Sequence, residues 1–415
     1  MVQETFKLRD YQEELSSKGV DILRKHNIIY YSLAVRTGKT AISLNTCKLF
    51  GSKKVLFLTK KKAISSIESD YYKFEFNNFF EIKIINNESL HYVEENDFDI
   101  IIMDEAHRLG SFPKPCKMAI DFKKRFSSKP IIFLSGTMSP ENYSQIYHQF
   151  WVSDYSPFKE YKNFYKWAHD YVNITQKRIG AFMHNDYSGG IEYKIMNEVN
   201  HLILTLTQEQ AGFSTQIDEE ILYVEMKPIT YKLSEKLFQD RIVEGKDEVI
   251  LADTAAKLMQ KQHQIFSGTI KFESGNSKIL DDSKAVFIKE RFNGSKLAIM
   301  YIFKEELNVL KSVFGDTLTT ELDEFNNTDK HFAGQVVSSR EGISLKKADY
   351  LIMYNIQHSA VSYWQARDRM TTMDRKENKV YFIFAKKGIE LNVYKTVMSK
   401  KKYTVNVFKK DYGIK

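Results

Sequence analysis

Several features are scarce in this chain of 415 residues, and each scarcity excludes a class of protein. Its two cysteines, Cys47 and Cys116, allow neither a disulfide framework nor a cysteine-based metal cluster, so we expect a reducing environment. Apolar runs such as 100–103 and 131–134 are far too short to cross a membrane. The first ten residues carry charges of both signs and no apolar stretch, so we expect no signal peptide.

The composition that remains is that of an ordinary globular protein with a basic balance. Hydrophobic residues make up 43% and charged residues 27% of the chain, and its length suits two or three domains. The formal net charge is +8 and the pI is near 9.0, which allows a polyanionic partner without proving one.

A phosphate-binding loop is indicated at residues 32–40, where an apolar run precedes Gly-Lys-Thr and a segment that can begin a helix follows. In such a loop the backbone N–H groups at the helix start cradle the phosphates. Lys39 would reach the β- and γ-phosphates, and the Thr40 hydroxyl would bind Mg²⁺. Because Leu33 stands where the pattern has its first glycine, the interpretation depends on the motifs that follow.

The next segments repeat one pattern, in which a short apolar strand is followed by a polar cluster and then a helical stretch. The expected strands are 54–58, 81–85, 98–103 and 130–134. Near-continuous apolar strands that alternate with helices indicate a parallel sheet covered on both faces. Such sheets bind ligands beyond the carboxyl ends of their strands, and each candidate motif follows such an end.

Residues 140–215 lose this pattern and are dense in tyrosine and phenylalanine. Aromatic side chains beside lysines can stack on bases, but a packed helical insertion explains the spacing better. The alternation then resumes, and we expect a second set of strands at 221–226, 296–302, 335–338, 350–354 and 379–384. Helices are expected at 229–238, 252–265 and 304–314.

The string Asp-Glu-Ala-His at 104–107 closes an expected buried strand. Asp104 would hold Mg²⁺, and Glu105 would orient or deprotonate an attacking water. A solvated acidic turn has the same sequence, so its place downstream of Gly-Lys-Thr strengthens the interpretation. His107 need not bind metal, because a histidine beside a carboxylate is commonly a hydrogen-bonded structural residue.

Two further short stretches have plausible roles at a nucleotide site. Ser135, Gly136 and Thr137 follow another strand and offer two hydroxyls and a flexible link, suited to relaying the nucleotide state. Gln12 lies upstream of the loop, where its amide could recognise the adenine edge because it both donates and accepts. The alternative for Gln12 is a surface glutamine on an amphipathic helix.

The C-terminal half contains a candidate arginine finger. Gln365 and Arg369 are four residues apart and therefore on one helical face. An arginine there could reach a γ-phosphate, a contact worth about 10³–10⁵ in rate in GTPases. The alternative is a surface ion pair with Asp368 or Glu341.

The order of these motifs along nearly the whole chain resembles that of superfamily 2 helicases and translocases. The stretches that carry the resemblance are Gln12, 38–40, Thr59, 104–107, 135–137, 338–345 and 365–369. Within that superfamily, residues 8–12, the stretch from 338 to 349 and the Gln-Ala-x-Asp-Arg of 365–369 are similar to Swi/Snf-type translocases. The chain contains the DEAH string, and its compactness is similar to that of bacteriophage-encoded members.

The resemblance implies an α/β fold of two RecA-like lobes, each with a parallel sheet covered by helices. It implies an ATP-binding lobe at 1–150, a helical, aromatic-rich insertion at 151–219 and a second lobe at 220–415, with ATP and Mg²⁺ between the lobes. The implied catalytic residues are Lys39, Asp104, Glu105, Gln365 and Arg369. ATP would be bound by Gln12, Arg36, Thr37, Gly38, Lys39, Thr40 and Gly342, and Mg²⁺ by Thr40 and Asp104. Nucleic acid would contact Thr59, Lys60, Asn86, Ser338 and Ser339, and Ser135, Gly136 and Thr137 would couple the two sites.

The sequence also departs from the family pattern. Leu33 replaces a loop glycine, and Ser344 stands where Swi/Snf-type members prefer asparagine. Thr372 occupies the place of a second arginine in the finger motif, for which Arg367 or Arg375 could compensate. Slower turnover would follow from these changes.

The sequence thus predicts a nucleic-acid-dependent ATPase that acts as a DNA helicase or duplex-DNA translocase, with DNA preferred to RNA. Three alternatives stay open: an RNA helicase, a nucleotide-gated DNA clamp that scarcely hydrolyses, and an unrelated P-loop kinase or NTPase. The motifs of the C-terminal half count against the last. We expect a monomer in the cytoplasm of a bacterial or phage-infected cell, with replication or repair proteins as partners and no membrane association.

Overall fold

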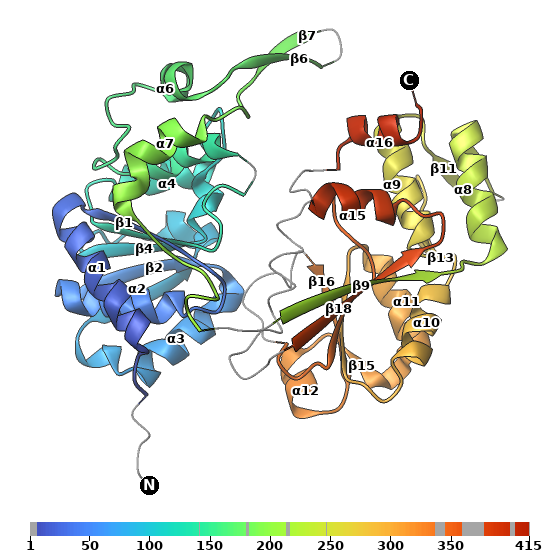
Figure 1. Ribbon diagram of the computed structural model, residues 1–415, viewed down its shortest axis with the longest axis horizontal. Coiled ribbons are helices and arrows are strands. Elements are labelled where there is room, and N and C mark those ends of the chain that lie inside the picture. Colours follow the sequence, from blue (N-terminus) through green and yellow to red (C-terminus); the bar gives the residue numbers. More distant parts are fainter. Residues whose placement is uncertain are drawn as a thin grey trace. The chain divides into compact units, whose positions relative to one another are not determined.

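The computed structural model describes residues 6–140, 142–179, 182–212, 216–245, 247–336, 345–358, 377–398 and 403–414. Contacts divide the chain into two compact units, Met1–Phe213 and Ser214–Lys415, here called unit 1 and unit 2. Each unit has a six-stranded sheet with helices on both faces (Figure 1). This confirms the predicted α/β fold of two RecA-like lobes. Among the described residues, no helix is long and apolar enough to span a bilayer.

The sheet of unit 1 has the strand order β3-β2-β4-β5-β1-β8, and every neighbouring pair is parallel. Its strands are β1 (Ile28–Leu33), β2 (Lys54–Thr59), β3 (Glu81–Asn86), β4 (Ile100–Asp104), β5 (Ile131–Ser135) and β8 (Ile203–Leu206). β2 to β5 lie close to the ranges expected from the apolar runs, and β1 is the apolar run that precedes the phosphate loop. Because all six run the same way, their carboxyl ends share one edge of the sheet.

The helices of unit 1 form two layers. One layer consists of α1 (Asp10–His26), α2 (Lys39–Phe50) and α3 (Ile64–Lys73). The other consists of α4 (Lys117–Phe126), α5 (Ile146–Trp151), α6 (Phe164–Tyr171) and α7 (Glu192–Val199). Short 3₁₀ turns connect them: η1 (Lys61–Ala63), η2 (Phe76–Asn78), η3 (Asn87–Tyr92), η4 (Ala106–Leu109), η5 (Tyr143–Gln145) and η6 (Asn200–Leu202).

Strand β1 separates two hydrophobic cores in unit 1. Ile28 and Tyr30 pack into one core, whereas Ile29, Tyr31 and Leu33 pack into the other. This alternation follows from the two-residue period of a strand, whose successive side chains point to opposite faces. Because both faces are covered, the strand is apolar on both sides and lacks the polar alternation of a half-exposed strand.

The aromatic-rich stretch that we expected to form a segment of its own packs onto unit 1. Tyr147 and Trp167 are fully buried with their rings 5.0 Å apart, in the same core as Tyr30. Strand β8 then pairs with β1 and completes the sheet. The contact boundary therefore falls at 213/214, whereas the sequence suggested boundaries near 150 and 219. The antiparallel hairpin β6 (Thr175–Ile179) and β7 (Phe182–Asp186) projects from unit 1 (Figure 1).

The sheet of unit 2 is also parallel, with the order β15-β16-β14-β17-β18-β9. Its strands are β9 (Gln216–Val224), β14 (Leu297–Tyr301), β15 (Leu318–Thr319), β16 (His331–Gln335), β17 (Tyr350–Met353) and β18 (Glu377–Ala385). Two hairpins flank it, β10 (Ile242–Glu244) with β11 (Val249–Leu251) and β12 (Thr269–Lys271) with β13 (Ser277–Ile279). Strand β16 comes earlier than the predicted 335–338, because the buried residues Phe332 and Ala333 precede that range.

The helices of unit 2 are α8 (Pro228–Asp240), α9 (Ala255–Phe266), α10 (Ser283–Arg291), α11 (Lys304–Phe314), α12 (Leu322–Asn327), α15 (Glu390–Met398) and α16 (Val405–Asp411), with one 3₁₀ turn, η7 (Gly315–Thr317). A fully buried ion pair joins two of them. Lys284 on α10 donates to Glu390 on α15 over 2.6 Å, and both side chains are completely shielded from solvent.

Candidate nucleotide-binding site

Four strand ends of unit 1 bring the predicted nucleotide-site residues to one edge of the sheet. The strand order places β5 between β1 and β4, with β2 on the far side of β4. Thr59, Asp104 and Ser135 are the last residues of β2, β4 and β5, and Lys39 begins the helix that follows β1. The edge therefore assembles residues that are almost a hundred positions apart in the sequence.

The loop between β1 and α2 turns through two left-handed residues, Arg36 with φ 66° and Gly38 with φ 81°. A Cβ atom added at Gly38 would lie 2.1 Å from Nε2 of Gln12, so this position requires glycine twice over. Leu33, which replaces the first glycine of the pattern, is the fully buried last residue of β1. The turn begins only after it, which explains why a leucine is tolerated there.

Side chains on either side of the loop hold its carbonyl groups. Tyr11 and Gln12 both donate to the Thr37 carbonyl, over 3.1 and 3.2 Å. The Thr37 hydroxyl donates to the Ala34 carbonyl over 2.8 Å, and Gln208 donates to the Val35 carbonyl over 3.2 Å. With the carbonyls held, the first N–H groups of α2, which lack intrahelical partners, form the cradle that a phosphate needs.

In this structure Gln12 is hydrogen-bonded to the phosphate loop. Its side chain is buried, with Nε2 on the Thr37 carbonyl and Oε1 accepting the backbone N–H of Arg9. Its predicted recognition of adenine stays a prediction.

Lys39 lies where the ends of β1 and β5 meet. Its ammonium group donates to the carbonyls of Leu33 and Ala34 over 3.2 and 3.4 Å. A Cβ atom added at Gly136 would stand 3.8 Å from that nitrogen, so the turn after β5 passes close to the ammonium group. The cation is therefore held directly over the start of the phosphate loop.

The two acidic residues at the end of β4, Asp104 and Glu105, differ in their electrostatics. Asp104 accepts hydrogen bonds from the Thr59 hydroxyl over 2.8 Å and from the Glu105 backbone over 3.0 Å. Burial, and after it the negative charge of Glu105, raises the pKa of Asp104 to about 6, and the Thr59 bond and the charge of Lys39 only partly offset this.

The pKa of Glu105 is shifted the other way, downward, so this residue stays ionised. Burial alone raises its pKa, but the contact with His107 and the positive charges of Lys39 and Lys60 outweigh burial and lower the pKa below its usual value. Nδ1 of His107 lies 3.2 Å from a Glu105 carboxylate oxygen.

The same histidine connects the ends of β4 and β5. Nδ1 of His107 is 3.0 Å from the Ser135 hydroxyl, which donates to the Thr137 carbonyl and accepts the Thr137 N–H. The predicted coupling segment Ser135, Gly136 and Thr137 is therefore joined to Glu105 through His107, and Gly136 lies near the Lys39 ammonium group.

The residues predicted to contact nucleic acid have mixed positions. Thr59 is fully buried against Asp104. Asn86 accepts the Ser89 N–H and so caps η3, and Lys60 is a half-buried residue directly before η1. Ser338, Ser339, Gly342, Gln365 and Arg369 lie outside the described residues, as do Ser344, Arg367, Thr372 and Arg375.

Sequence reasoning missed two contributors to the site. Tyr11 adjoins Gln12 and could have been found from that neighbour. Gln208 carries no sequence signal, because its position depends on β8 pairing with β1.

The oxygen donors at this edge suit Mg²⁺ better than a metal with an all-protein ligand shell. In the described part of the chain, no three histidine, cysteine or acidic side chains lie together as a metal cluster would require. Mg²⁺ usually keeps several waters and takes one or two carboxylates plus substrate phosphates. The Asp104 carboxylate with the Thr40 hydroxyl is a donor set of that kind.

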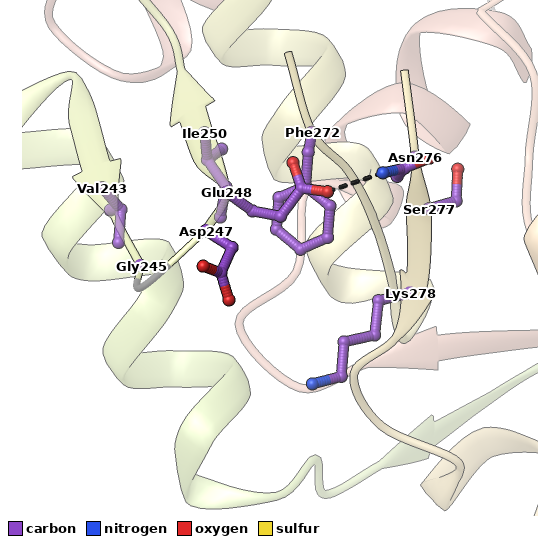
Figure 2. A pocket seen from close by; sticks show the side chains of 9 residues that line it. All are labelled: Val243, Gly245, Asp247, Glu248, Ile250, Phe272, Asn276, Ser277 and Lys278. Carbon is purple, nitrogen blue, oxygen red and sulfur yellow. Dashed lines mark hydrogen bonds between the residues drawn. The ribbon is translucent and has the colours of Figure 1, made fainter. Parts of the chain in front are cut away.

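A separate groove lies in unit 2 between the hairpins β10–β11 and β12–β13. Figure 2 shows its half-buried floor at Phe272 and its charged rim at Asp247 and Lys278. The Glu248 carboxylate accepts hydrogen bonds from Asn276 and from Ser274, so it joins the two hairpins to each other. The residues lining this groove include none of the predicted site residues.

Comparisons with known proteins add little to this geometry. No protein-family model and no curated protein matches the chain. Among solved structures, it is similar to the Sulfolobus solfataricus SWI2/SNF2 ATPase core in complex with dsDNA, with 14% sequence identity and a TM-score of 0.44. That match covers 98% of this chain and 93% of the other. At this identity and TM-score the likeness adds no argument to the sheet topology.

Proposed function

We propose that the chain is a nucleic-acid-dependent ATPase that acts on DNA as a translocase or helicase. The observation that carries the proposal is the chain of contacts along the carboxyl edge of unit 1. It joins Thr59, Asp104, Glu105, His107 and Ser135 and ends beside Lys39, next to a loop shaped for phosphates.

The loop and its lysine account for triphosphate binding. The N–H groups at the start of α2 face the phosphates, and Lys39 turns from its own loop carbonyls to the β- and γ-phosphates. Thr40 and Asp104 would hold Mg²⁺, which when bound neutralises charge on the transferred phosphoryl group. Asp104 serves this role as a carboxylate, so nucleotide binding in the presence of Mg²⁺ is expected to weaken as the pH falls below about 6.

Glu105 is the residue we assign to the attacking water. Its lowered pKa keeps it ionised at neutral pH, and the contact with His107 orients one of its oxygens. Positioning and electrostatic stabilisation supply most of the rate in phosphoryl transfer. The His107–Ser135 contact gives a route by which changes at Glu105 reach the turn after β5.

The remaining roles rest on the resemblance of the motif order. We assign the finger to Arg369 with Gln365, and contacts with the nucleic-acid backbone to Ser338 and Ser339 and to residues of unit 1 such as Lys60. The net charge of +8 suits a polyanionic track. We propose DNA as that track, a monomeric protein, and replication or repair proteins as partners.

Steady-state ATP turnover of the full chain tests the proposal. It is measured without nucleic acid and with duplex DNA, single-stranded DNA and RNA. Stimulation by duplex DNA supports the translocase, and stimulation by RNA alone replaces it with an RNA helicase. Tight nucleotide-dependent DNA binding without turnover replaces it with a clamp. If ATP is not hydrolysed and does not change DNA binding, the result contradicts the nucleotide site itself.

The Glu105→Gln variant tests the assignment of the water-activating residue. We expect it to retain ATP binding and to lose turnover by at least about a hundredfold, because a neutral amide cannot accept the water proton. The matched control is Glu88→Gln, since Glu88 is an exposed carboxylate that pairs with Arg108. Undiminished turnover in Glu105→Gln would remove this residue from the mechanism.

A further inference from the structure

The phosphate loop is tied to the segment that follows β8. The Ala34 N–H donates to the Leu206 carbonyl over 2.9 Å, and the next residue, Val35, accepts the side-chain amide of Gln208 over 3.2 Å. Two successive loop residues are thus bonded to the last part of unit 1, which the structure describes as far as residue 212.

The turn that carries Gln208 is built independently of the loop. Gln210 accepts the Thr207 N–H through its side chain, and its own N–H donates to the Thr207 hydroxyl. Ala211 donates to the Thr207 carbonyl and is buried in the core below. Gln208 therefore projects from a turn that has hydrogen bonds of its own, and its amide donates to the Val35 carbonyl.

The loop is held on both sides of its most strained residue. Arg36 has a left-handed backbone that a non-glycine residue rarely adopts. The carbonyl before it is held by Gln208, and the carbonyl after it is held by Tyr11 and Gln12. Such a conformation persists when its surroundings over-determine it.

We propose that Gln208 is a positioning residue for triphosphate binding, and that its turn, residues 207–212, responds to the nucleotide. The proposal rests on the proposed function and deepens it. By holding the Val35 carbonyl away from the phosphates, Gln208 keeps the neighbouring N–H groups turned toward them. Coupling between two sites is reciprocal, so a nucleotide that orders the loop also orders the turn. This turn directly precedes the boundary between the two units at 213/214.

A matched pair of glutamine variants in the full chain tests the proposal. Gln208→Met keeps the side-chain length and loses the amide that holds the loop. Gln210→Met loses a bond within the same turn and none to the loop. The readouts are the affinity for a fluorescent, non-hydrolysable ATP analogue, the KM and kcat for ATP, and the melting temperature.

We expect Gln208→Met to weaken analogue binding by about 3- to 10-fold and to raise KM with little change in kcat, as the loss of one hydrogen bond predicts. Gln210→Met should stay within about twofold of the unaltered protein. Unchanged affinity in Gln208→Met overturns the proposal. Equal weakening in both variants overturns it too, since the turn would then act only by its stability.

Hydrogen exchange on the unaltered chain provides a second test that needs no variant. The ATP analogue should slow exchange in 203–212 as well as in the loop, and an unchanged rate in 203–212 overturns the proposal. If the unaltered chain fails to bind the analogue at all, the proposed function fails, and this inference fails with it. Binding by the unaltered chain with no effect of Gln208→Met defeats the inference alone.

Discussion

Asp104 is a side chain whose charge costs stability in the unliganded protein. Its folded pKa of about 6 lies above the ordinary value of 3.8. The folded state therefore binds the proton more tightly than the unfolded state. The stability that this carboxyl contributes is present below about pH 4 and is lost as the pH rises through 6.

We therefore expect Asp104→Asn to stabilise the unliganded protein at pH 7.5, by roughly 1–3 kcal/mol, and to have little effect near pH 4. The same variant should lose Mg²⁺-dependent nucleotide hydrolysis, because the amide is a poorer ligand. Thermal unfolding at the two pH values measures the first effect. Asp21→Asn, an exposed carboxylate on α1, is the control and should change little. A lower melting temperature for Asp104→Asn at pH 7.5 would contradict the expected penalty.

At the scale of single residues, the residue types of the candidate site could be recognised in the sequence, but the contacts between them could not. Residues 38–40 and 104–105 could be recognised as site candidates because each group stands at the end of an apolar run in the sequence. The bond between Thr59 and Asp104 does not, since it depends on β2 lying beside β4. Gln208 was equally invisible, because a glutamine in a polar turn has no pattern that marks it.

Between elements, helix α1 packs on strand β1 with Gly19 at the point where the Tyr31 ring approaches the helix. A Cβ atom at Gly19 would lie 1.7 Å from the Tyr31 hydroxyl oxygen and 2.7 Å from its ring carbon Cζ. The Tyr31 ring is fully buried, and its hydroxyl bonds with Thr46 and with the Leu15 carbonyl. The ring therefore has little room to move.

Gly19→Ala is thus expected to destabilise unit 1 by about 1–3 kcal/mol through overpacking. This sign is opposite to the usual effect, since alanine stabilises a helix interior over glycine by roughly 0.5–1 kcal/mol. Chemical denaturation followed by the fluorescence of Trp151 and Trp167 measures it. Ser17→Ala on the exposed face of α1 is the control, with an expected change within about 0.5 kcal/mol. A stabilising Gly19→Ala would refute this packing.

In unit 2, the buried pair Lys284–Glu390 ties α10 to α15. Lys284→Met leaves a carboxylate buried without its cation, which should cost about 3–5 kcal/mol. The double variant Lys284→Met with Glu390→Gln should recover much of that loss. Hydrogen exchange of peptides from α10 and α15 reports the change in unit 2 specifically.

The surface pair Lys257–Asp253 provides the matched control. Its two side chains are 42% and 49% exposed, so Lys257→Met should cost less than about 1 kcal/mol. Equal effects of Lys284→Met and Lys257→Met would show that burial does not set the strength of the inner pair.

Elements with strong apolar runs were predicted close to their positions, and weakly patterned ones were not. β2, β3, β4 and β5 of unit 1 and β14 and β17 of unit 2 lie near their predicted ranges. β16 was placed too late, because Gly334 interrupts its apolar run and lysine precedes it. The hairpin β6–β7 and strand β8 escaped notice because they are short and lie in the aromatic-rich stretch.

At the scale of the whole molecule, contacts divide the chain into two units. The two hydrophobic cores of unit 1 lie entirely within that unit. The clusters on the two faces of its sheet draw all their residues from positions up to 211. The sequence suggested three parts because the aromatic-rich stretch breaks the strand–helix alternation. It could not show that the same aromatic side chains pack back onto β1 and β5, since that depends on tertiary contacts.

We therefore expect a fragment of residues 1–213 to fold by itself and to bind the ATP analogue, since the phosphate loop and both cores are complete within it. It should not show turnover stimulated by nucleic acid, because the predicted finger lies in unit 2. A cooperative melting transition and analogue titration measure these properties. A fragment of 1–150, which ends before β8, is the comparison and should be unstable. Cooperative folding of 1–150 would instead favour the boundary that the sequence suggested.

The strand that leads into the phosphate loop is also the partition between the two cores of its unit. Alternate residues of β1 pack into the two cores. Unfolding of either core would therefore disrupt β1 and the phosphate loop that follows it. A compound that binds the loop should consequently raise the melting temperature of the entire unit in a single transition. A thermal-shift screen of nucleotides against this protein would then detect occupancy of the loop from any probe in the unit, including the tryptophans of its other core.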